Sequence, residues 1–417
     1  MTLASYREYK DTGALWPTKI PNSWSLTPIK RLASMTYGDA LPPNARNESG
    51  PVPVYGSNGA FGRHGDANTS APVVLIGRKG SCGALNWSNV PAFAIDTVYF
   101  VDSQHAACNL RWLFWALHTA NLSSLSQDTG VPGLSREIAY EIRLPQPPQT
   151  EQNAVAAFLD RETGKIDALV EEQRQLIELL KEKRQAVISH AVTKGLNPNV
   201  AMKASGVEWL GEVPEHWDIV PVGALFRFVK RQDGDAGQVL SVYRDYGVIP
   251  KASREDNINK TPEDLSKYQT VLPGDLVVNK MKAWQGSLGV SNYTGITSPD
   301  YAVFEPRHKA VSDYLNLLLR CNLLPTVYRA ISNGIRPDQW RIEPDKLREL
   351  KVPYPPRNDQ EAISHHLVEA VGRWDELRNE AETAILLLQE RRSALISAAV
   401  TGKIDTRETT QADVEAA

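Results

Sequence analysis

The chain has 417 residues, of which 42% are hydrophobic and 23% charged, and its formal net charge is −3 at neutral pH. This length favours two to four domains, and the hydrophobic content is sufficient for packed cores. No apolar run approaches the roughly 18 residues needed to cross a membrane, and MTLASYREYK lacks the apolar core of a signal peptide, so we expect a cytoplasmic protein. Cys82, Cys108 and Cys321 are isolated, which fits a reducing compartment and excludes metal-binding spacing.

The net charge excludes a strongly basic nucleic-acid-binding protein, but the charge is unevenly distributed. Residues 358–417 contain 6 Lys and Arg against 12 Asp and Glu, whereas residues 204–357 contain 20 against 19 and residues 1–149 contain 12 against 10. The two large segments are therefore slightly basic. Local patches that bind DNA are permitted, although the bulk charge does not argue for them.

A similar segment opens each half of the chain. A Gly-x-x-Trp motif followed by Pro-x-x-Trp occupies residues 13–24 and recurs at residues 206–217. We interpret these tryptophans as packing residues rather than as ligand-binding ones. The duplication therefore includes the start of each half.

The stretches that follow, residues 25–145 and 218–351, are where the halves diverge. Both are rich in Gly and Pro, with short apolar runs at 73–76, 94–101 and 275–278 that predict strands. Helical patterns at 110–122 and 311–324 complete a mixed, mainly β domain in each half. Similar framing elements around different contents are expected if two modules perform one operation on two different targets.

Each half ends in a long helical pattern. Residues 144–193 align without a gap against residues 352–401, and both begin at Pro-x-Pro-Pro, which indicates a duplicated unit rather than a solenoid. About forty residues at about 1.5 Å each predict a rod of roughly 60 Å. We expect the helix starts to be capped by Thr150 and Asn358, with Asn153 and Glu361 three residues on, and the helix ends to fall at Gly195 and Gly402.

Apolar residues recur along both helices in a pattern that predicts a heptad seam. Gln173 and Ala381 interrupt it at equivalent places, as do Lys183 and Arg391. Because a helix of this length cannot bury its apolar stripe alone, we predict an intramolecular, antiparallel two-helix coiled coil. The alternative is that each helix packs separately on its own globular domain. The expected seam consists of Leu159, Ile166, Leu169, Leu176, Leu180 and Val187 in the first helix, and Leu367, Trp374, Leu377, Leu388 and Leu395 in the second.

The sequence contains no pattern that predicts catalysis or a metal site. It has no phosphate-binding Gly-x-x-x-x-Gly-Lys-Ser/Thr loop, no Gly-x-Gly-x-x-Gly after a strand and no His-Glu-x-x-His. His365 and His366 are adjacent on a helix and so point to different faces. The Pro-x-Pro-Pro runs superficially resemble the Asn/Asp-Pro-Pro-aromatic motif of amino-methyltransferases, but Gln146 and Tyr354 stand where the acid or amide is required, so we interpret the prolines as helix stops.

Two loops with basic and polar side chains follow predicted strands at corresponding places in the two halves, at residues 77–81 and 279–286. Lys and Arg can hold phosphates or guanine edges, while Gln and Ser can reach base edges. Taken singly, each such residue is equally compatible with DNA binding and with an ordinary surface charge. The corresponding placement in the two halves favours a DNA-binding role for the two loops. The candidate DNA-binding residues, in these loops and elsewhere, are Arg63, Arg78, Lys79, Ser81, Arg136, Lys280, Lys282, Trp284, Gln285, Arg336, Gln339 and Arg341.

The duplicated helices, the Pro-x-Pro-Pro leads, the tryptophan openings and the divergent globular stretches together closely resemble the specificity subunit of type I restriction-modification systems. The resemblance covers the chain up to about residue 405. It implies that each globular stretch is a target recognition domain for one half of a bipartite DNA sequence. It further implies that the paired helices set the gap between the halves and dock two modification subunits. Those subunits would bring S-adenosylmethionine and adenine methylation, and restriction subunits using ATP and Mg²⁺ would join outside them. This chain would then bind no cofactor itself.

The expected architecture is an α+β fold with two β-rich recognition domains, joined by two long antiparallel helices with pseudo-two-fold symmetry. Its parts are a first target recognition domain at 1–148, a central spacer helix at 149–195, a second target recognition domain at 196–356, a C-terminal spacer helix at 357–404, and an acidic flexible tail at 405–417.

Two other functions remain open from the sequence alone. One is a non-enzymatic coiled-coil adaptor that binds proteins rather than DNA; a salt-dependent gel shift with duplex DNA separates the two, because phosphate contacts weaken as salt rises. The other is a nuclease or methyltransferase whose catalytic site does not follow a known motif.

Overall fold

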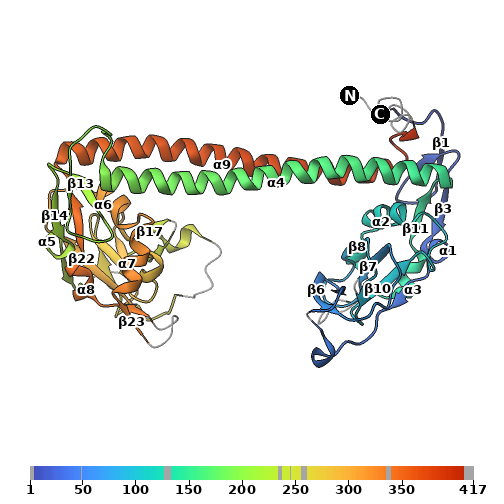
Figure 1. The fold of residues 1–417 in the computed structure, drawn as a ribbon, viewed down its shortest axis with the longest axis horizontal. Coiled ribbons are helices and arrows are strands. Elements are labelled where there is room, and N and C mark those ends of the chain that lie inside the picture. The colour runs from blue at the N-terminus through green and yellow to red at the C-terminus, as the bar shows by residue number, and fades with distance from the viewer. Residues whose placement is uncertain are drawn as a thin grey trace. The chain divides into compact units, whose positions relative to one another are not determined.

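The computed structural model describes residues 4–47, 49–125, 133–232, 237–244, 246–254, 261–334 and 340–407. The chain forms two compact units: unit 1 comprises residues up to Gln173 and from Thr383 on, and unit 2 comprises Arg174–Glu382. Each unit contains part of both long helices, α4 (Gln149–Lys194) and α9 (Arg357–Val400), which pack side by side (Figure 1). Among the described residues, no helix is long and apolar enough to cross a membrane.

Unit 1 is built around a four-stranded antiparallel sheet in the order β4-β10-β7-β8, with β4 at Thr36–Tyr37, β10 at Val98–Asp102, β7 at Val73–Gly77 and β8 at Leu85–Ser88. The smaller sheets are β1 (Tyr9–Asp11) with β2 (Lys19–Pro21), β3 (Ser25–Pro28) with β11 (Arg143–Gln146), and β6 (Gly59–His64) with β5 (Val52–Gly56) and β9 (Phe93–Ala94). The helices are α1 (Ile29–Leu32), α2 (Leu110–His118) and α3 (Arg136–Glu141), and short 3₁₀ turns lie at η1 (Pro43–Ala45) and η2 (Leu122–Leu125).

Unit 2 contains a matching four-stranded sheet in the order β15-β22-β19-β20, with β15 at Phe226–Val229, β22 at Tyr301–Pro306, β19 at Leu276–Asn279 and β20 at Leu288–Val290. Its two-stranded pairs are β12 (Met202–Ala204) with β13 (Glu212–Pro214), β14 (Asp218–Pro221) with β25 (Lys351–Tyr354), β16 (Leu240–Tyr243) with β17 (Gly247–Pro250), β18 (Gln269–Val271) with β21 (Gly295–Thr297), and β23 (Ser332–Asn333) with β24 (Arg341–Ile342). The helices are α5 (Val222–Leu225), α6 (Ser312–Leu319), α7 (Leu324–Ala330) and α8 (Pro344–Glu349), and 3₁₀ turns lie at η3 (Lys251–Ser253) and η4 (Ala283–Gln285).

The two units repeat one plan. In both, an opening hairpin is followed by a strand that pairs with the segment leading into the long helix, as β3 pairs with β11 and β14 with β25. In both, a four-stranded sheet and one helix beside it, α2 or α6, form the centre of the domain. The predicted α+β class and the pairing of the two long helices are therefore confirmed.

The central strands are buried on both faces because their alternating side chains enter two different clusters. In β7, Val74 and Ile76 pack with α2 in the main core of unit 1, whereas Val73 and Leu75 pack with Ala94 in a second cluster on the opposite face. In unit 2, Leu276 and Val278 of β19 enter the main core, and Val277 faces a second cluster. A continuous apolar run can form a strand here only because both faces are covered.

Three of the expected elements are shorter than their patterns. The run at 94–101 is broken by a turn at Asp96 and Thr97, so only β10 continues the central sheet. The helical pattern at 311–324 ends with α6, and α7 follows as a separate helix. The helix in the pattern at 110–122 likewise ends early, at the last residue of α2, His118. The apolar pattern is longer than the helix because Leu122, beyond its end, also packs in the core.

A buried tryptophan holds the start of each long helix. The Trp24 indole Nε1 donates to Glu151 Oε2 at 2.8 Å, and the Tyr6 hydroxyl donates to the same oxygen at 2.7 Å. In unit 2, the Trp217 Nε1 donates to Asp359 Oδ2 at 2.9 Å. Glu151 and Asp359 occupy the same position of the duplicated helix, so the second tryptophan of each opening motif fixes a helix start.

The expected caps are wrong by a residue or two. The backbone N–H groups of Glu151 and Gln152 both bond to the carbonyl of Pro148 at 2.9 Å, so Thr150 lies inside the first turn. In α9 the N–H groups of Asp359 and Gln360 bond to Pro356 in the same way, at 3.0 and 3.1 Å. Asn358 is therefore also inside the helix, because each proline run leads directly into the first turn. The expected glycines do follow the helices, in the left-handed conformation at Gly195 (φ +79°) and Gly402 (φ +73°).

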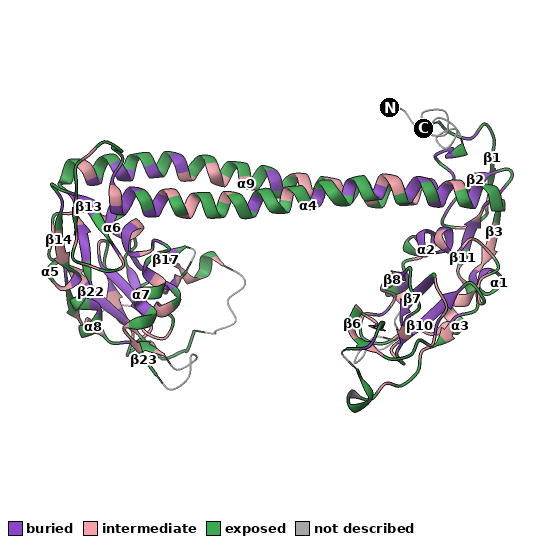
Figure 2. Cartoon of the chain, viewed as in Figure 1, coloured by how far each residue is buried: buried purple, intermediate pink, exposed green. Residues whose placement is uncertain are grey.

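The packed line along α4 follows an uninterrupted heptad spacing. Figure 2 shows buried and exposed segments alternating along both long helices. Three leucines of the expected seam are instead exposed: Leu169 by 45%, Leu176 by 41% and Leu377 by 47%. The remaining expected seam residues are buried or half-buried. The residues of α4 on the packed line are 159, 163, 166, 170, 173, 177, 180, 184, 187 and 191.

The register was misassigned because three polar residues, Thr163, Gln173 and Arg184, lie on the packed line. Counting apolar residues alone therefore favours Leu169 and Leu176 over their neighbours Val170 and Ile177, which are the buried ones. Gln173 does not interrupt the seam but belongs to it. The antiparallel direction is visible within unit 1, where Arg392 of α9 forms a two-point ion pair with Asp167 of α4 at 2.8 and 3.3 Å.

The residues after α9 pack on unit 1. The Asp405 N–H donates to the Ala4 carbonyl at 2.8 Å, and the Arg407 guanidinium lies 4.8 Å from the Tyr6 ring centroid. Thr406 is fully buried. The chain is thus ordered against unit 1 as far as Arg407, beyond residue 405 where a flexible tail was expected, because Asp405 and Arg407 pair with each other over Tyr6.

Candidate nucleic-acid interface

The two loops singled out in the sequence follow equivalent strands. β7 and β19 occupy the same place in the two four-stranded sheets. β7 lies between β10 and β8, and β19 lies between β22 and β20. Residues 78–84 therefore connect β7 to β8, and residues 280–287 connect β19 to β20. The two sets of candidate residues lie at the same end of the same hairpin in each unit.

In unit 1, an aromatic ring brings together two candidates that lie far apart in the sequence. The guanidinium carbons of Arg78 and Arg136 each lie 4.9 Å from the Tyr37 ring centroid. Arg78 also donates through Nη1 to the Asp96 carbonyl at 2.9 Å. Burial raises the pKa of the neighbouring Tyr99 hydroxyl to about 12, so that group stays a neutral donor, here to the Leu134 carbonyl at 3.0 Å.

Stacking of this kind prepares arginines for recognition. A guanidinium stacked on an aromatic ring keeps its in-plane N–H groups available for phosphate oxygens or the O6 and N7 of guanine. The stack also reduces the conformational freedom that binding would otherwise remove. Tyr37 was not among the expected residues, since nothing in the sequence connects β4 with Arg78 or Arg136.

The remaining candidates of unit 1 are placed differently. Lys79 is exposed next to Arg78. The Ser81 hydroxyl contacts Asn58 Oδ1 at 3.4 Å. Arg63, on β6, donates to the backbone carbonyls of Gly50 and Pro51 at 2.6 and 2.8 Å. Two of its nitrogens thus hold a loop, which makes Arg63 the weakest of the unit 1 candidates.

In unit 2 the loop after β19 folds as the 3₁₀ turn η4. Lys282 and Gln285 are exposed on it, whereas Lys280 donates through Nζ to the Pro299 carbonyl at 3.1 Å. The Trp284 indole donates to the Met281 carbonyl at 3.1 Å, which closes the turn. Lys282 and Gln285 therefore point their polar ends outward from a fixed backbone.

A second cluster of aromatic and basic side chains adjoins η4. The Trp284 ring meets Trp340 edge to face at 5.4 Å, and Arg329 of α7 lies 4.9 Å from the Trp340 centroid. Arg341 directs its Nε–H at the Met281 sulfur at 2.8 Å, so two predicted candidates, Trp284 and Arg341, share one surface. Trp340 and Arg329 were not predicted; the adjacency of Trp340 to Arg341 in the sequence was the available signal. Arg336 and Gln339 lie outside the described residues.

Comparisons with known proteins find a matching domain and several similar chains. Residues 21–179 match the family described as type I restriction modification DNA specificity domain. The chain is 26% identical over 360 residues to the type I restriction enzyme MjaVIII specificity subunit of Methanocaldococcus jannaschii, covering 81% of this chain and 77% of that protein. It is 28% identical over 356 residues to the EcoBI specificity subunit of Escherichia coli, covering 79% and 73%.

The fold is also found among solved structures. A chain from a study of complex assembly and conformational transition of the type I R-M system has a TM-score of 0.62 at 15% identity, covering 93% of this chain and 100% of that one. The match assigns residues 21–179 to the type I restriction modification DNA specificity domain. Over most of its length the chain is similar to specificity subunits of type I restriction-modification systems, the family that its sequence resembles.

Proposed function

We propose that this chain recognises a bipartite DNA target, with one half-site read by each unit. The observation that supports the proposal most directly is that equivalent hairpins, β7–β8 and β19–β20, carry different polar side chains in the two units. Equivalent placement with different chemistry is what two readers of unlike sequences require. Arg78 and Lys79 belong to the reader in residues 1–148, and Lys282 and Gln285 to the reader in residues 196–356.

The physical basis is direct readout in the major groove. Each base pair presents a distinct pattern of donors and acceptors there, and Arg or Lys pairs with guanine O6 and N7. The phosphate contacts of other basic side chains set the position of each reader without selecting a sequence. The candidate residues Arg63, Ser81, Arg136, Lys280, Trp284, Arg336, Gln339 and Arg341 complete the two proposed surfaces.

The paired helices serve in this proposal as the spacer between half-sites. α4 has 46 residues and is therefore about 69 Å long, close to two turns of B-DNA at about 34–36 Å each. A stiff spacer permits one gap length between the half-sites. The exposed surface of the helix pair docks two modification subunits, which supply S-adenosylmethionine and adenine methylation, and restriction subunits with ATP and Mg²⁺ join outside them. In this proposal the chain itself carries no cofactor and no catalytic group.

Half-site discrimination by two single-residue variants tests the proposal. The chain, assembled with its modification subunits, is titrated with duplexes that carry both half-sites or a one-base change in either. Lys79→Ala is expected to lower discrimination at one half-site by about tenfold, since a good base contact discriminates by about 1–3 kcal/mol. Lys282→Ala is the matched control and is expected to lower discrimination only at the other half-site.

The outcome separates two independent readers from other arrangements. If either variant lowers discrimination at both half-sites to the same extent, the two units do not read separately. If neither variant changes discrimination although both bind DNA, the two loops are not the readers.

A further inference from the structure

A cleft of about 630 Å³ lies in unit 2 between the long helix α4 and the recognition domain. Arg184 and Ile188 line it from α4, and Arg244, Trp284, Gln285 and Arg320 line it from the domain. Trp284 and Gln285 are the η4 residues proposed above as DNA-reading candidates. The cleft therefore directly adjoins the proposed DNA surface of this unit.

The described lining of the cleft is rich in arginine. Three arginines line it, and no aspartate or glutamate is among the described residues that do so. The Arg184 Nε is buried without a hydrogen-bond partner among the described residues. Withdrawing a charged donor from water without a partner is unfavourable, so the arrangement favours an anion that supplies acceptors.

The position of Arg320 is set by the backbone around it. Its Nη2 donates to the Arg244 carbonyl at 3.0 Å, and its guanidinium lies over Gly247. A Cβ at Gly247, where φ is +71°, would stand 3.2 Å from the Arg320 guanidinium carbon. Glycine at this position leaves room for the cation beside the cleft.

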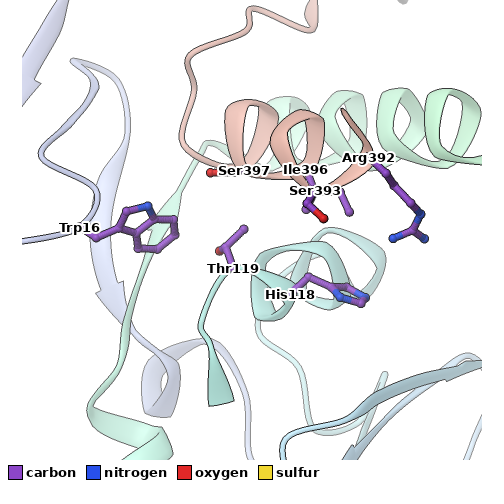
Figure 3. A pocket seen from close by; sticks show the side chains of 7 residues that line it. All are labelled: Trp16, His118, Thr119, Arg392, Ser393, Ile396 and Ser397. Atoms are coloured by element: carbon purple, nitrogen blue, oxygen red, sulfur yellow. The ribbon is translucent and has the colours of Figure 1, made fainter. Parts of the chain in front are cut away.

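The same place in unit 1 is also a pocket, but there the arginine of the long helix has a carboxylate partner. Figure 3 shows Arg392, Ser393 and Ile396 of α9 above His118 at the end of α2. Arg392 and Ile396 are the duplicates of Arg184 and Ile188, since the two long helices align at an offset of 208 residues. In unit 1 Arg392 is paired with Asp167 at 2.8 Å.

Other groups in unit 1 reduce its positive charge further. Arg111 is paired with Asp160 at 2.7 Å. His118 retains an exposed surface, but desolvation of its ring, together with the charges of Arg392 and Arg111, lowers its pKa to about 4, so it is neutral at physiological pH. The unit 2 counterpart of Asp167 is Asp375, which contacts Arg378 at 3.4 Å instead. The duplication thus preserved the pocket, but Arg184 of α4 has no carboxylate partner among the residues that the structure describes.

We propose that the unit 2 cleft binds phosphate groups of the DNA backbone beside the half-site that this unit reads, with Arg184 and Arg320 as the phosphate-binding residues. The inference rests on the proposed function. A duplex in contact with Gln285 places phosphates next to the same cleft, and the planar fork of an arginine matches two phosphate oxygens. The spacer helix α4 then takes part in DNA binding itself.

The test measures DNA binding at several salt concentrations by the full chain assembled with its modification subunits. The variants are Arg184→Gln and the double variant Arg184→Gln with Arg320→Gln. The matched control is Lys183→Gln, which removes the same charge from the adjacent, exposed position of α4. The probes are a duplex carrying both half-sites and an unrelated duplex of equal length.

The double variant is expected to bind both duplexes about tenfold more weakly, with the sequence preference unchanged, because phosphate contacts carry no sequence information. The slope of log affinity against log salt should fall by about 0.9 for each lost contact, hence by about 2. Arg184→Gln alone should show about half of this change in slope. Lys183→Gln should match the wild type.

Other outcomes overturn the inference. If the wild type binds its target and the variants retain its affinity and salt slope, the cleft does not bind phosphate, and the proposed function stands. If Arg184→Gln weakens assembly with the modification subunits but not DNA binding, the occupant is an acidic protein surface. If the wild-type complex does not select any duplex, the proposed function fails and the inference with it. Thermal melting verifies that each variant is folded, and the single variant preserves the test if Arg320→Gln unfolds the domain.

Discussion

At the scale of single residues, the duplication shows which side chains have structural roles. Gln152 and Gln360 occupy the same helix position, and each accepts a backbone N–H at the start of the neighbouring helix, from Asn109 or Val311, at 2.8 Å. Each also donates to a carbonyl of its proline run, at 2.9 and 2.7 Å. The proline runs were correctly interpreted as helix stops, but these glutamine bridges require the tertiary structure to be seen.

We expect a half-buried histidine, His308, to make unit 2 sensitive to acid. The His308 ring packs on Phe226 at 4.8 Å and its Nδ1 accepts the Ala310 N–H at 3.1 Å; burial lowers its pKa below the ordinary value of 6.5. Below pH 6.5 the unfolded chain therefore binds more protons at this residue than the folded chain does. The contribution of His308 to stability is present above pH 6.5 and is lost as the pH falls below it.

We therefore expect the melting temperature of the wild type to decrease more between pH 7.5 and pH 5.5 than that of His308→Asn. Asparagine retains an acceptor for Ala310 but does not titrate in this range. Melting curves of the two proteins in matched buffers measure the difference. Equal decreases in the two proteins would show that His308 does not contribute to acid sensitivity.

At the scale of elements, the long helices were predictable in length, start and pairing, whereas their seam register was not. Their repeated Pro-x-Pro-Pro leads and glycine ends delimit them within the sequence itself. The register depends on polar residues such as Gln173 being half-buried between two helices, and periodicity counted on apolar residues cannot show this.

Two adjacent residues of α4 test the register. Ile177 lies on the packed line and is buried, whereas Leu176 is 41% exposed. Ile177→Asn should lower the free energy of unfolding by about 2–4 kcal/mol, because it removes buried methyl groups and buries an amide. Leu176→Asn should change the free energy of unfolding by no more than about 0.5 kcal/mol.

Urea unfolding followed by circular dichroism measures both variants. The assigned register would be wrong if Leu176→Asn were the more destabilising change. A similar loss in both variants would indicate that α4 is covered on both faces, with the exposed leucines buried in an assembly of the isolated chain.

The candidate site was only partly predictable from the sequence. The loops after β7 and β19 were predicted to correspond, and the sheet order shows that they follow equivalent strands. The stacking of Arg78 and Arg136 on Tyr37 was not predictable, because three segments distant in sequence meet there. That Arg184 has no carboxylate partner in the described part of the chain was not predictable either, since its duplicate Arg392 has one and the residue at the two positions is the same.

At the scale of the whole molecule, the proposed function combines two DNA-reading units and one spacer in a single chain. The match of residues 21–179 to a DNA specificity domain supports a role in DNA recognition, and the repeated plan of the two units is the basis for proposing a target in two parts. If α4 and α9 act as a stiff spacer, the number of base pairs between the half-sites must be the same at every recognised site. A flexible connection would instead permit several gap lengths.

Sequencing of methylated adenines in the genome of a host that expresses this chain with its modification subunit tests the central claim most directly. We expect every methylated site to contain two different half-sites, separated by one constant number of unspecified base pairs, with a methylated adenine in each. A single continuous target, or half-sites separated by gaps of varying length, would contradict the account.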